Sequence, residues 1–182
     1  MMQPKNIWIG KLDPHQSPSY QQGSLSVGDI CAYQFRGTAF LIKLALTLKL
    51  DQKVISTASV YFHRFYLRNS FHLWDFHDIA STCLFIASKV SDKNIPLKYL
   101  IDVCIKACKN DNYIPEEKEY KKWRKIILYT EEFILSSLCY DLEIETAYDF
   151  MLEIVPRWEV GMDGKGISQM CWALYNDRFM LN

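Results

Sequence analysis

The sequence predicts an all-α domain, and three observations lead to this prediction. Aspartate and proline, which start helices, recur ahead of segments whose apolar residues are spaced three and four apart. No segment alternates apolar and polar residues between turn-forming residues, as a half-buried strand would. Residues 79–88 carry no charged side chain, and a helix that is apolar or small on every side has to be surrounded by other helices. We therefore expect a ring of helices around a central one.

The expected helices can be placed from the residues that begin them. Asp29, Asp51 and Asp75 stand ahead of apolar-periodic segments, where an aspartate side chain caps a helix. Pro96 and Pro115 stand where a first-turn proline is tolerated. The five helices expected from these signals span residues 29–49, 51–68, 75–90, 96–109 and 115–139, with 75–90 at the centre.

Both ends of the chain differ from this middle part. Residues 1–28 contain three prolines and three glycines without a sustained period, so we expect an irregular arm. Toward the other end, Thr146 with Asp149 resembles a capping box, and the helix that it begins should stop before Pro156. A glycine-containing loop follows, and a last helix is expected over residues 167–178.

The composition argues against several classes of protein. Lys and Arg together number 21, as do Asp and Glu, so the basic excess typical of phosphate-binding proteins is missing and we expect no direct nucleic-acid partner. No apolar stretch reaches the ~20 residues of a membrane span, and the first residues do not resemble a secretory signal. The six cysteines are scattered without a C-x-x-C pair, which indicates buried, reduced thiols. We expect no membrane partner and no cofactor.

The doublet His77-Asp78 is the feature that most suggests enzymatic chemistry. All-helical metal-dependent phosphohydrolases hold a divalent ion with such a doublet, a second histidine upstream and an aspartate downstream, and His63 and Asp102 could fill those outer positions. However, Asp78 lies in the first turn of its expected helix, where the helix dipole favours an acidic residue in any case. We therefore expect no metal ligands and no catalytic residues, and keep a phosphohydrolase as an alternative.

Lys89 and Glu131 are charges at the margins of apolar faces. Lys89 follows the uncharged segment, beside Ile86 and Val90, and Glu131 lies one turn before Leu135. Spacing alone leaves two interpretations open. Each charge can be an ordinary surface residue, or the two segments can form a docking surface on which apolar residues supply area and the charges fix orientation.

The second and third expected helices resemble the first cyclin box. The resemblance rests on the runs Val60-Tyr61-Phe62-His63-Arg64-Phe65-Tyr66-Leu67, Ser70-Phe71, and Ala80 with Leu84-Phe85-Ile86-Ala87-Ser88-Lys89-Val90. The Tyr-Phe-His-Arg-Phe-Tyr run is similar to the cyclin K, T and L group of transcription cyclins. Further similar segments are the arm from Trp8 to Ser19, Glu131 with the run Leu138-Cys139-Tyr140-Asp141-Leu142, and Gln169-Met170-Cys171-Trp172.

The resemblance implies a five-helix cyclin box and a division of the chain. Residues 1–28 would form an N-terminal arm and residues 29–145 the first cyclin box. Residues 146–182 would form a linker helix and the first helix of an incomplete second box, whose apolar residues, Trp172 and Leu174 among them, would be exposed.

The resemblance also implies a function. The chain would be a regulatory subunit, not an enzyme, that binds and activates a transcriptional cyclin-dependent kinase in the nucleus and directs it to the C-terminal repeat tail of RNA polymerase II. The residues that it implies for kinase binding are the charged pair Lys89 and Glu131, with Ile86, Val90, Leu135 and Tyr140 as apolar contacts.

Two departures from the family pattern bear on these expectations. Ser91-Asp92 stands where many members carry acidic residues, so one carboxylate is missing. Arg36 resembles an arginine that many cyclins pair with an aspartate, but His63 occupies the partner position, and a buried unpaired arginine would be costly. A promoter-bridging role, as in transcription factor IIB, would use the same fold and is a second alternative, against which the neutral charge argues.

Overall fold

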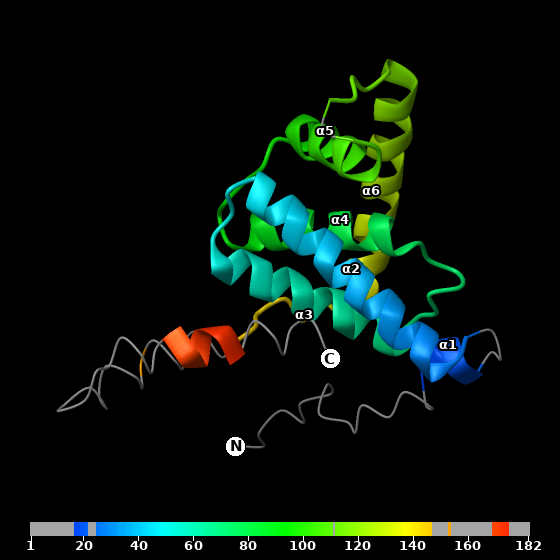
Figure 1. The fold of residues 1–182 in the computed structure, drawn as a ribbon, viewed down its shortest axis with the longest axis vertical. Helices are drawn as coiled ribbons and strands as arrows, with labels where there is room; N and C mark the ends of the chain where they lie inside the picture. The colour runs from blue at the N-terminus through cyan, green and yellow to red at the C-terminus, as the bar shows by residue number, and fades with distance from the viewer. Residues whose placement is uncertain (1–16, 22–24, 111, 147–152, 154–168, 175–182) are drawn as a thin grey trace.

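The structure is a computed structural model, and it describes residues 17–21, 25–110, 112–146, 153 and 169–174. Figure 1 shows a bundle of helices, and no strand occurs in these residues. Six helices are labelled in chain order: α1 (Pro18–Gln21), α2 (Val27–Thr47), α3 (Gln52–Arg68), α4 (Phe76–Val90), α5 (Leu97–Cys108) and α6 (Glu117–Ser137). The all-α prediction is therefore confirmed.

Helix α4 is the centre of the bundle. Every residue from Ile79 to Ser88 is buried, and α2, α3, α5 and α6 all pack against this helix. Asp75 accepts a hydrogen bond from the backbone N–H of His77 at 2.8 Å and so caps α4. The uncharged segment is thus the central helix that its composition predicts, with neighbours on every side.

The start of α2 differs from the prediction. The cap is Ser26, three residues before Asp29. The Ser26 hydroxyl accepts from the Asp29 N–H at 3.2 Å, while the Asp29 carboxylate accepts from the Ser26 N–H at 3.1 Å. The Ser26 hydroxyl also donates to the Asp29 carboxylate at 2.6 Å, and this bond, together with the one from the Ser26 N–H, lowers the pKa of Asp29. The aspartate therefore serves as the acidic partner of a capping box rather than as the cap itself.

Part of the expected irregular arm is ordered against the bundle. Pro18–Gln21 forms the short helix α1, which packs on α2 and α3. Ser19 is buried, and its hydroxyl accepts a hydrogen bond from the Phe71 N–H at 3.0 Å. The prediction of an irregular segment up to residue 28 was therefore wrong for α1, which tertiary contacts stabilise, and for the first turn of α2, which the local capping box stabilises.

The crossing of α2 and α3 depends on a glycine. A Cβ atom at Gly37 would lie 2.1 Å from the ring of Phe62, which is fully buried. Only a glycine lets the two helices approach this closely. Arg36, next to it, is exposed, so the costly case of a buried and unpaired arginine does not arise there.

The structure describes only part of the C-terminal region, so only some of the expectations for it can be compared with the structure. Residues 169–174 are helical, within the helix expected over 167–178. Trp172 is 36% and Leu174 66% exposed. The helix expected from Thr146 toward Pro156 lies almost entirely outside the described residues. In the described part of the chain, no helix combines the length and apolar character that a membrane crossing requires.

Candidate functional site

The C-terminal end of α4 holds an ion pair with α6. The Lys89 Nζ donates a hydrogen bond to Glu131 Oε1 at 2.6 Å and lies 4.0 Å from the centre of the Phe85 ring. The Lys89 side chain is 43% exposed, whereas that of Glu131 is only 19% exposed. Helix packing thus brings together two charges that the sequence separates by 42 residues.

Apolar side chains accompany this pair at the surface. Val90 is 43% and Tyr140 67% exposed, and Leu135 is partly buried. Leu135 lies one turn beyond Glu131 on α6, and its carbonyl accepts from the Tyr140 N–H at 3.0 Å. We call these residues the α4–α6 surface: Lys89, Val90, Glu131, Leu135 and Tyr140.

The structure changes the expected set of contact residues at two positions, Ile86 and Leu128. Ile86 is 2% exposed, so it supports the surface from beneath and offers almost no area for contact. Leu128, which the sequence interpretation did not select, is 42% exposed and precedes Glu131 by three positions on the same helix face. The three- and four-residue spacing of Leu128, Glu131 and Leu135 was the signal that could have identified it.

The segment after α6 is held by three side chains of α3. The Tyr61 hydroxyl donates to the Leu142 carbonyl at 2.6 Å. Arg64 donates to the Asp141 carboxylate at 3.2 Å and to its carbonyl at 3.4 Å. Arg68 donates to the carbonyl of Ser137 at 3.1 Å and to the Cys139 sulfur at 2.9 Å. These contacts join positions 69 to 81 residues apart, which no local sequence signal indicates.

Burial affects the protonation of this cluster. Burial raises the pKa of Tyr61, so its hydroxyl stays protonated and remains a donor. Burial also lowers the pKa of Arg64, and the nearby Asp141 carboxylate opposes that shift. Asp141 thus compensates a partly buried guanidinium, which would otherwise be costly.

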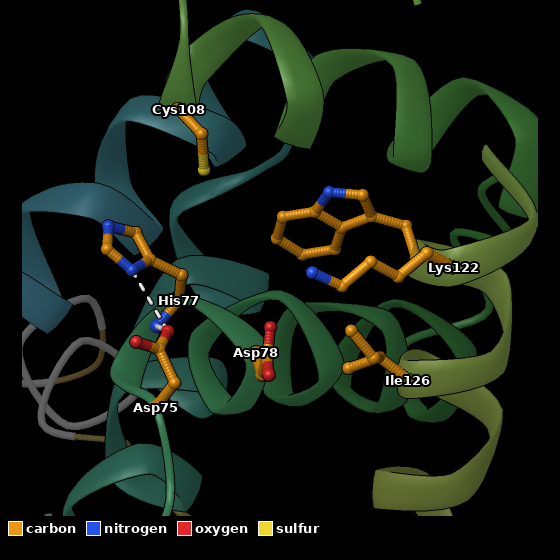
Figure 2. Close-up of a pocket in the computed structure, with 7 residues that line it drawn as sticks. Asp75, His77, Asp78, Cys108, Lys122 and Ile126 are labelled. Atoms are coloured by element: carbon orange, nitrogen blue, oxygen red, sulfur yellow. Dashed lines mark hydrogen bonds and ion pairs between the residues drawn. The ribbon is translucent and has the colours of Figure 1, made fainter. Parts of the chain in front are cut away.

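A pocket lies at the other end of α4 and contains the candidate metal doublet (Figure 2). The pocket has a volume of about 460 Å³ between the start of α4, the end of α5 and the first turns of α6. Its lining residues are Asp75, His77, Asp78, Cys108, Lys122, Trp123 and Ile126.

The metal-site alternative finds no support in this pocket. His63 and Asp102 do not line it, and the described residues contain no group of three or more His, Cys, Asp or Glu side chains suited to a metal ion. The ring of His77 instead lies 3.0 Å from the Asp75 carboxylate. Burial and the nearby Asp75 raise the pKa of Asp78 to about 6.

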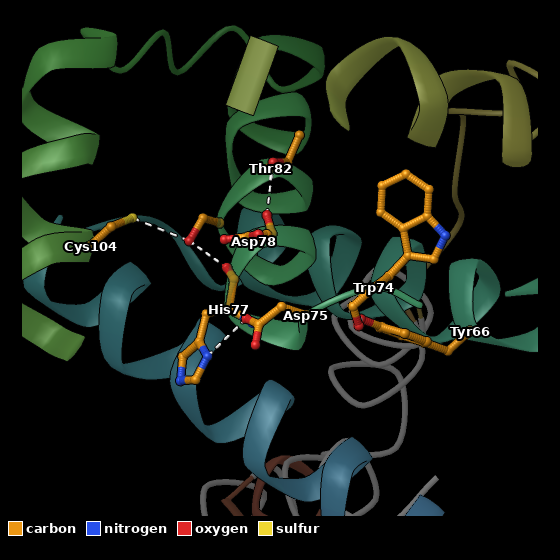
Figure 3. A network of polar contacts seen from close by, with 8 residues as sticks. Tyr66, Trp74, Asp75, His77, Asp78, Thr82 and Cys104 are labelled. Atoms are coloured by element: carbon orange, nitrogen blue, oxygen red, sulfur yellow. Dashed lines mark hydrogen bonds and ion pairs between the residues drawn. The ribbon is translucent and has the colours of Figure 1, made fainter. Parts of the chain in front are cut away.

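Polar groups around the start of α4 are satisfied locally (Figure 3). The Ser81 hydroxyl donates to the His77 carbonyl at 2.7 Å, and the Thr82 hydroxyl donates to the Asp78 carbonyl at 2.8 Å. The thiol of Cys104 in α5 donates to Ser81 at 3.2 Å. Burial raises the pKa of Cys104 to about 12, so this thiol is a core group rather than a nucleophile.

Comparison with known proteins agrees with this architecture. The family described as cyclin, N-terminal domain matches residues 32–143. Cyclin pch1 of Schizosaccharomyces pombe is 40% identical over 145 residues, which cover 78% of this chain and 42% of pch1. Cyclin-T1-5 of Arabidopsis thaliana is 31% identical over 143 residues, covering 76% and 24% respectively. The chain therefore spans less than half the length of these relatives.

A solved structure gives the same fold. A chain in the crystal structure of the yeast RNA Pol II CTD kinase CTDK-1 complex superposes with a TM-score of 0.75 at 20% sequence identity. The match covers 93% of this chain and 55% of the other, and at this identity it supports the fold alone. The family match, the two relatives and the helical bundle around α4 together show that the chain belongs to the cyclins, with relatives among the transcription-type members.

Proposed function

We propose that this chain is a non-catalytic regulatory subunit that binds and activates a cyclin-dependent kinase of the transcriptional class. The observation that carries the proposal is the Lys89–Glu131 pair, set at the margin of an apolar surface. An ion pair that solvent reaches, as it reaches the Lys89 side chain, contributes little to folding, about 1 kcal/mol or less. Its stronger effect is expected in a complex, where charges fix orientation and are partly desolvated.

Activation would follow from differential affinity for two kinase conformations. In an active kinase, a mobile helix supplies a glutamate that pairs with the lysine orienting ATP. A subunit whose rigid surface fits that helix only in its active position shifts the population toward the active state. The buried α4 gives the α4–α6 surface such rigidity, because ten consecutive residues of this helix are packed in the core.

Alanine substitution of the charged pair tests kinase binding. Lys89→Ala and Glu131→Ala are each expected to weaken binding to a kinase about tenfold or more, because each leaves its partner charge unpaired in the complex. The measurement is a titration against a panel of purified cyclin-dependent kinases. Full binding by the double variant would overturn the assignment of the surface.

The chain contains a matched control pair. Lys121 and Glu117 also form an ion pair on α6, at 2.7 Å, with both side chains more than 70% exposed. Removing this pair with alanines should leave kinase binding unchanged. If both double variants lose binding equally, the loss reflects general charge and not the α4–α6 surface.

We propose the repeat tail of RNA polymerase II as the kinase substrate and the nucleus as the site of action. Support comes from relatives that are transcription-type cyclins. The kinase bound to this chain should phosphorylate a repeat-tail peptide faster than the kinase alone. A tagged chain should accumulate in the nucleus, and exclusion from it would contradict the proposed location.

We also propose the division into arm, first cyclin box (29–145) and the beginning of a second box (146–182). The match of the cyclin family to residues 32–143 supports the extent of the first box. Limited proteolysis should cut near the proposed boundary at residue 145 and on the N-terminal side of Ser26, which caps α2. Cleavage within α4 at equal rate would contradict this division.

A further inference from the structure

The exit of α6 has two consecutive residues in the left-handed region. Cys139 and Tyr140 have φ angles of 55° and 56°. This left-handed region costs a non-glycine residue about 1 kcal/mol, and glycine is the common choice after a helix. The Cys139 N–H donates to the Ser136 carbonyl at 2.9 Å and the Tyr140 N–H to the Leu135 carbonyl at 3.0 Å. The chain therefore turns sharply and leaves Tyr140 67% exposed on the α4–α6 surface.

Strained backbone persists only where surrounding contacts determine it. Here the contacts come from Tyr61, Arg64 and Arg68, spaced three and four residues apart on one face of α3, which we call the α3 row. Together they bond to the chain at four positions between residues 137 and 142, on both sides of the two left-handed residues. The turn is thus fixed from outside α6.

We propose that the α3 row consists of positioning residues for kinase binding: it holds the left-handed exit of α6 so that Tyr140 is pre-set on the α4–α6 surface. The proposal rests on the proposed function, and it adds residues that do not touch the kinase. Pre-organisation strengthens binding because a side chain that is already ordered loses less conformational entropy in the complex.

A purely structural role predicts a different response. Lys49 and Asp92, just after α2 and α4, also lie in the left-handed region, but among the described residues only the exit of α6 has two such residues in succession. If the row served folding alone, its loss would weaken kinase binding equally whether or not Tyr140 is present.

A double-mutant cycle separates these cases. The full chain is prepared with Arg68→Met, with Tyr140→Ala and with both, and each form is titrated with the kinase that binds the unsubstituted chain tightest in the panel. We expect Arg68→Met to weaken binding about fivefold in the presence of Tyr140 and less than twofold in its absence. Equal weakening in both backgrounds would overturn the proposal.

A second measurement needs no kinase. Arg68→Met should speed hydrogen exchange of the Tyr140 amide about tenfold, because opening of the turn becomes easier, while amides of the buried α4 stay protected. Arg124→Met, at an exposed arginine of α6, is the control and should change neither. Unchanged exchange at Tyr140 would contradict the positioning role.

A less disruptive variant serves as a check in case Arg68→Met unfolds the chain. Tyr61→Phe removes only the hydroxyl that donates to Leu142 and keeps the buried ring, so it should reproduce both effects in weaker form. If Tyr140→Ala leaves binding unchanged while Lys89→Ala weakens it, the present inference fails and the proposed function stands. If neither variant weakens binding to any kinase of the panel, the proposed function fails as well.

Discussion

Charged side chains at the two ends of α4 have different kinds of partner. At the C-terminal end, Lys89 meets Glu131 of another helix at 2.6 Å and both reach the surface. At the N-terminal end, Asp75 and His77 interact within one turn, and Asp78 lines a pocket in which burial and the nearby Asp75 raise its pKa to about 6. These ends lie about 20 Å apart along the helix. Charges that join two helices mark the proposed docking surface, whereas charges satisfied within one turn stabilise the helix start.

The largest expected effect is a loss of folding stability, and it should distinguish a residue buried beneath the α4–α6 surface from a residue exposed on it. Ile86→Ala should lower the free energy of unfolding by about 3 kcal/mol, because it removes a fully packed side chain from the core. Val90→Ala, at a residue 43% exposed, should lower it by less than about 1 kcal/mol. Urea denaturation of both variants checks this. Equal losses would mean that the two residues do not divide into support and surface.

The next effect belongs to the N-terminal end. Asp75→Ala removes the side chain that caps α4 and should destabilise the fold by about 1 kcal/mol. Kinase affinity should stay within twofold of the unsubstituted chain, because the cap is remote from the α4–α6 surface. Thermal unfolding and a kinase titration on the same sample give both values. A loss of kinase affinity without a loss of stability would indicate that the docking surface lies near the pocket instead.

An effect of similar size depends on pH. The pKa of Asp78 is about 6 in the fold and near 3.8 in the unfolded chain, so the folded state binds more protons between these values. Its contribution to stability is therefore present below about pH 4 and is lost as the pH rises through 6. Asp78→Asn should be more stable than the unsubstituted chain at pH 7, by about 1 kcal/mol because solvent reaches part of the carboxylate.

The control for that effect is the same comparison at low pH. Near pH 4 the aspartate is protonated, and the two chains should unfold at similar denaturant concentrations. A constant difference across the range, measured by urea denaturation at several pH values, would show that the carboxylate of Asp78 does not titrate as described.

The fold was largely predictable because its signals are local. The uncharged segment identified α4, and Asp75 and Pro96 marked the starts of α4 and α5 within a residue. Asp51 stands at the N-cap of α3 as expected, but its side chain makes no capping hydrogen bond and lies 3.2 Å from Lys93 instead. A pattern gives a helix boundary, whereas the partner of a side chain depends on what tertiary packing brings near.

The candidate site was predictable only in part for the same reason. Lys89 and Glu131 were selected through the cyclin resemblance, and the structure pairs them. The contacts of Arg68 with the exit of α6 were not predicted, since they connect helices far apart in sequence. How Arg36 is satisfied could not be predicted, because whether a residue is buried depends on how its helix crosses its neighbours; in the structure this arginine is exposed.

A charge swap tests the central claim, that the Lys89–Glu131 pair docks a kinase, most directly. Lys89→Glu and Glu131→Lys are each expected to weaken kinase binding about 100-fold. Combined, they restore an ion pair between α4 and α6 but reverse both charges toward a partner. The account predicts that the double swap regains the thermal stability of the unsubstituted chain and not its kinase affinity. Recovery of full affinity by the double swap would show that the pair only joins the two helices, and would contradict the account.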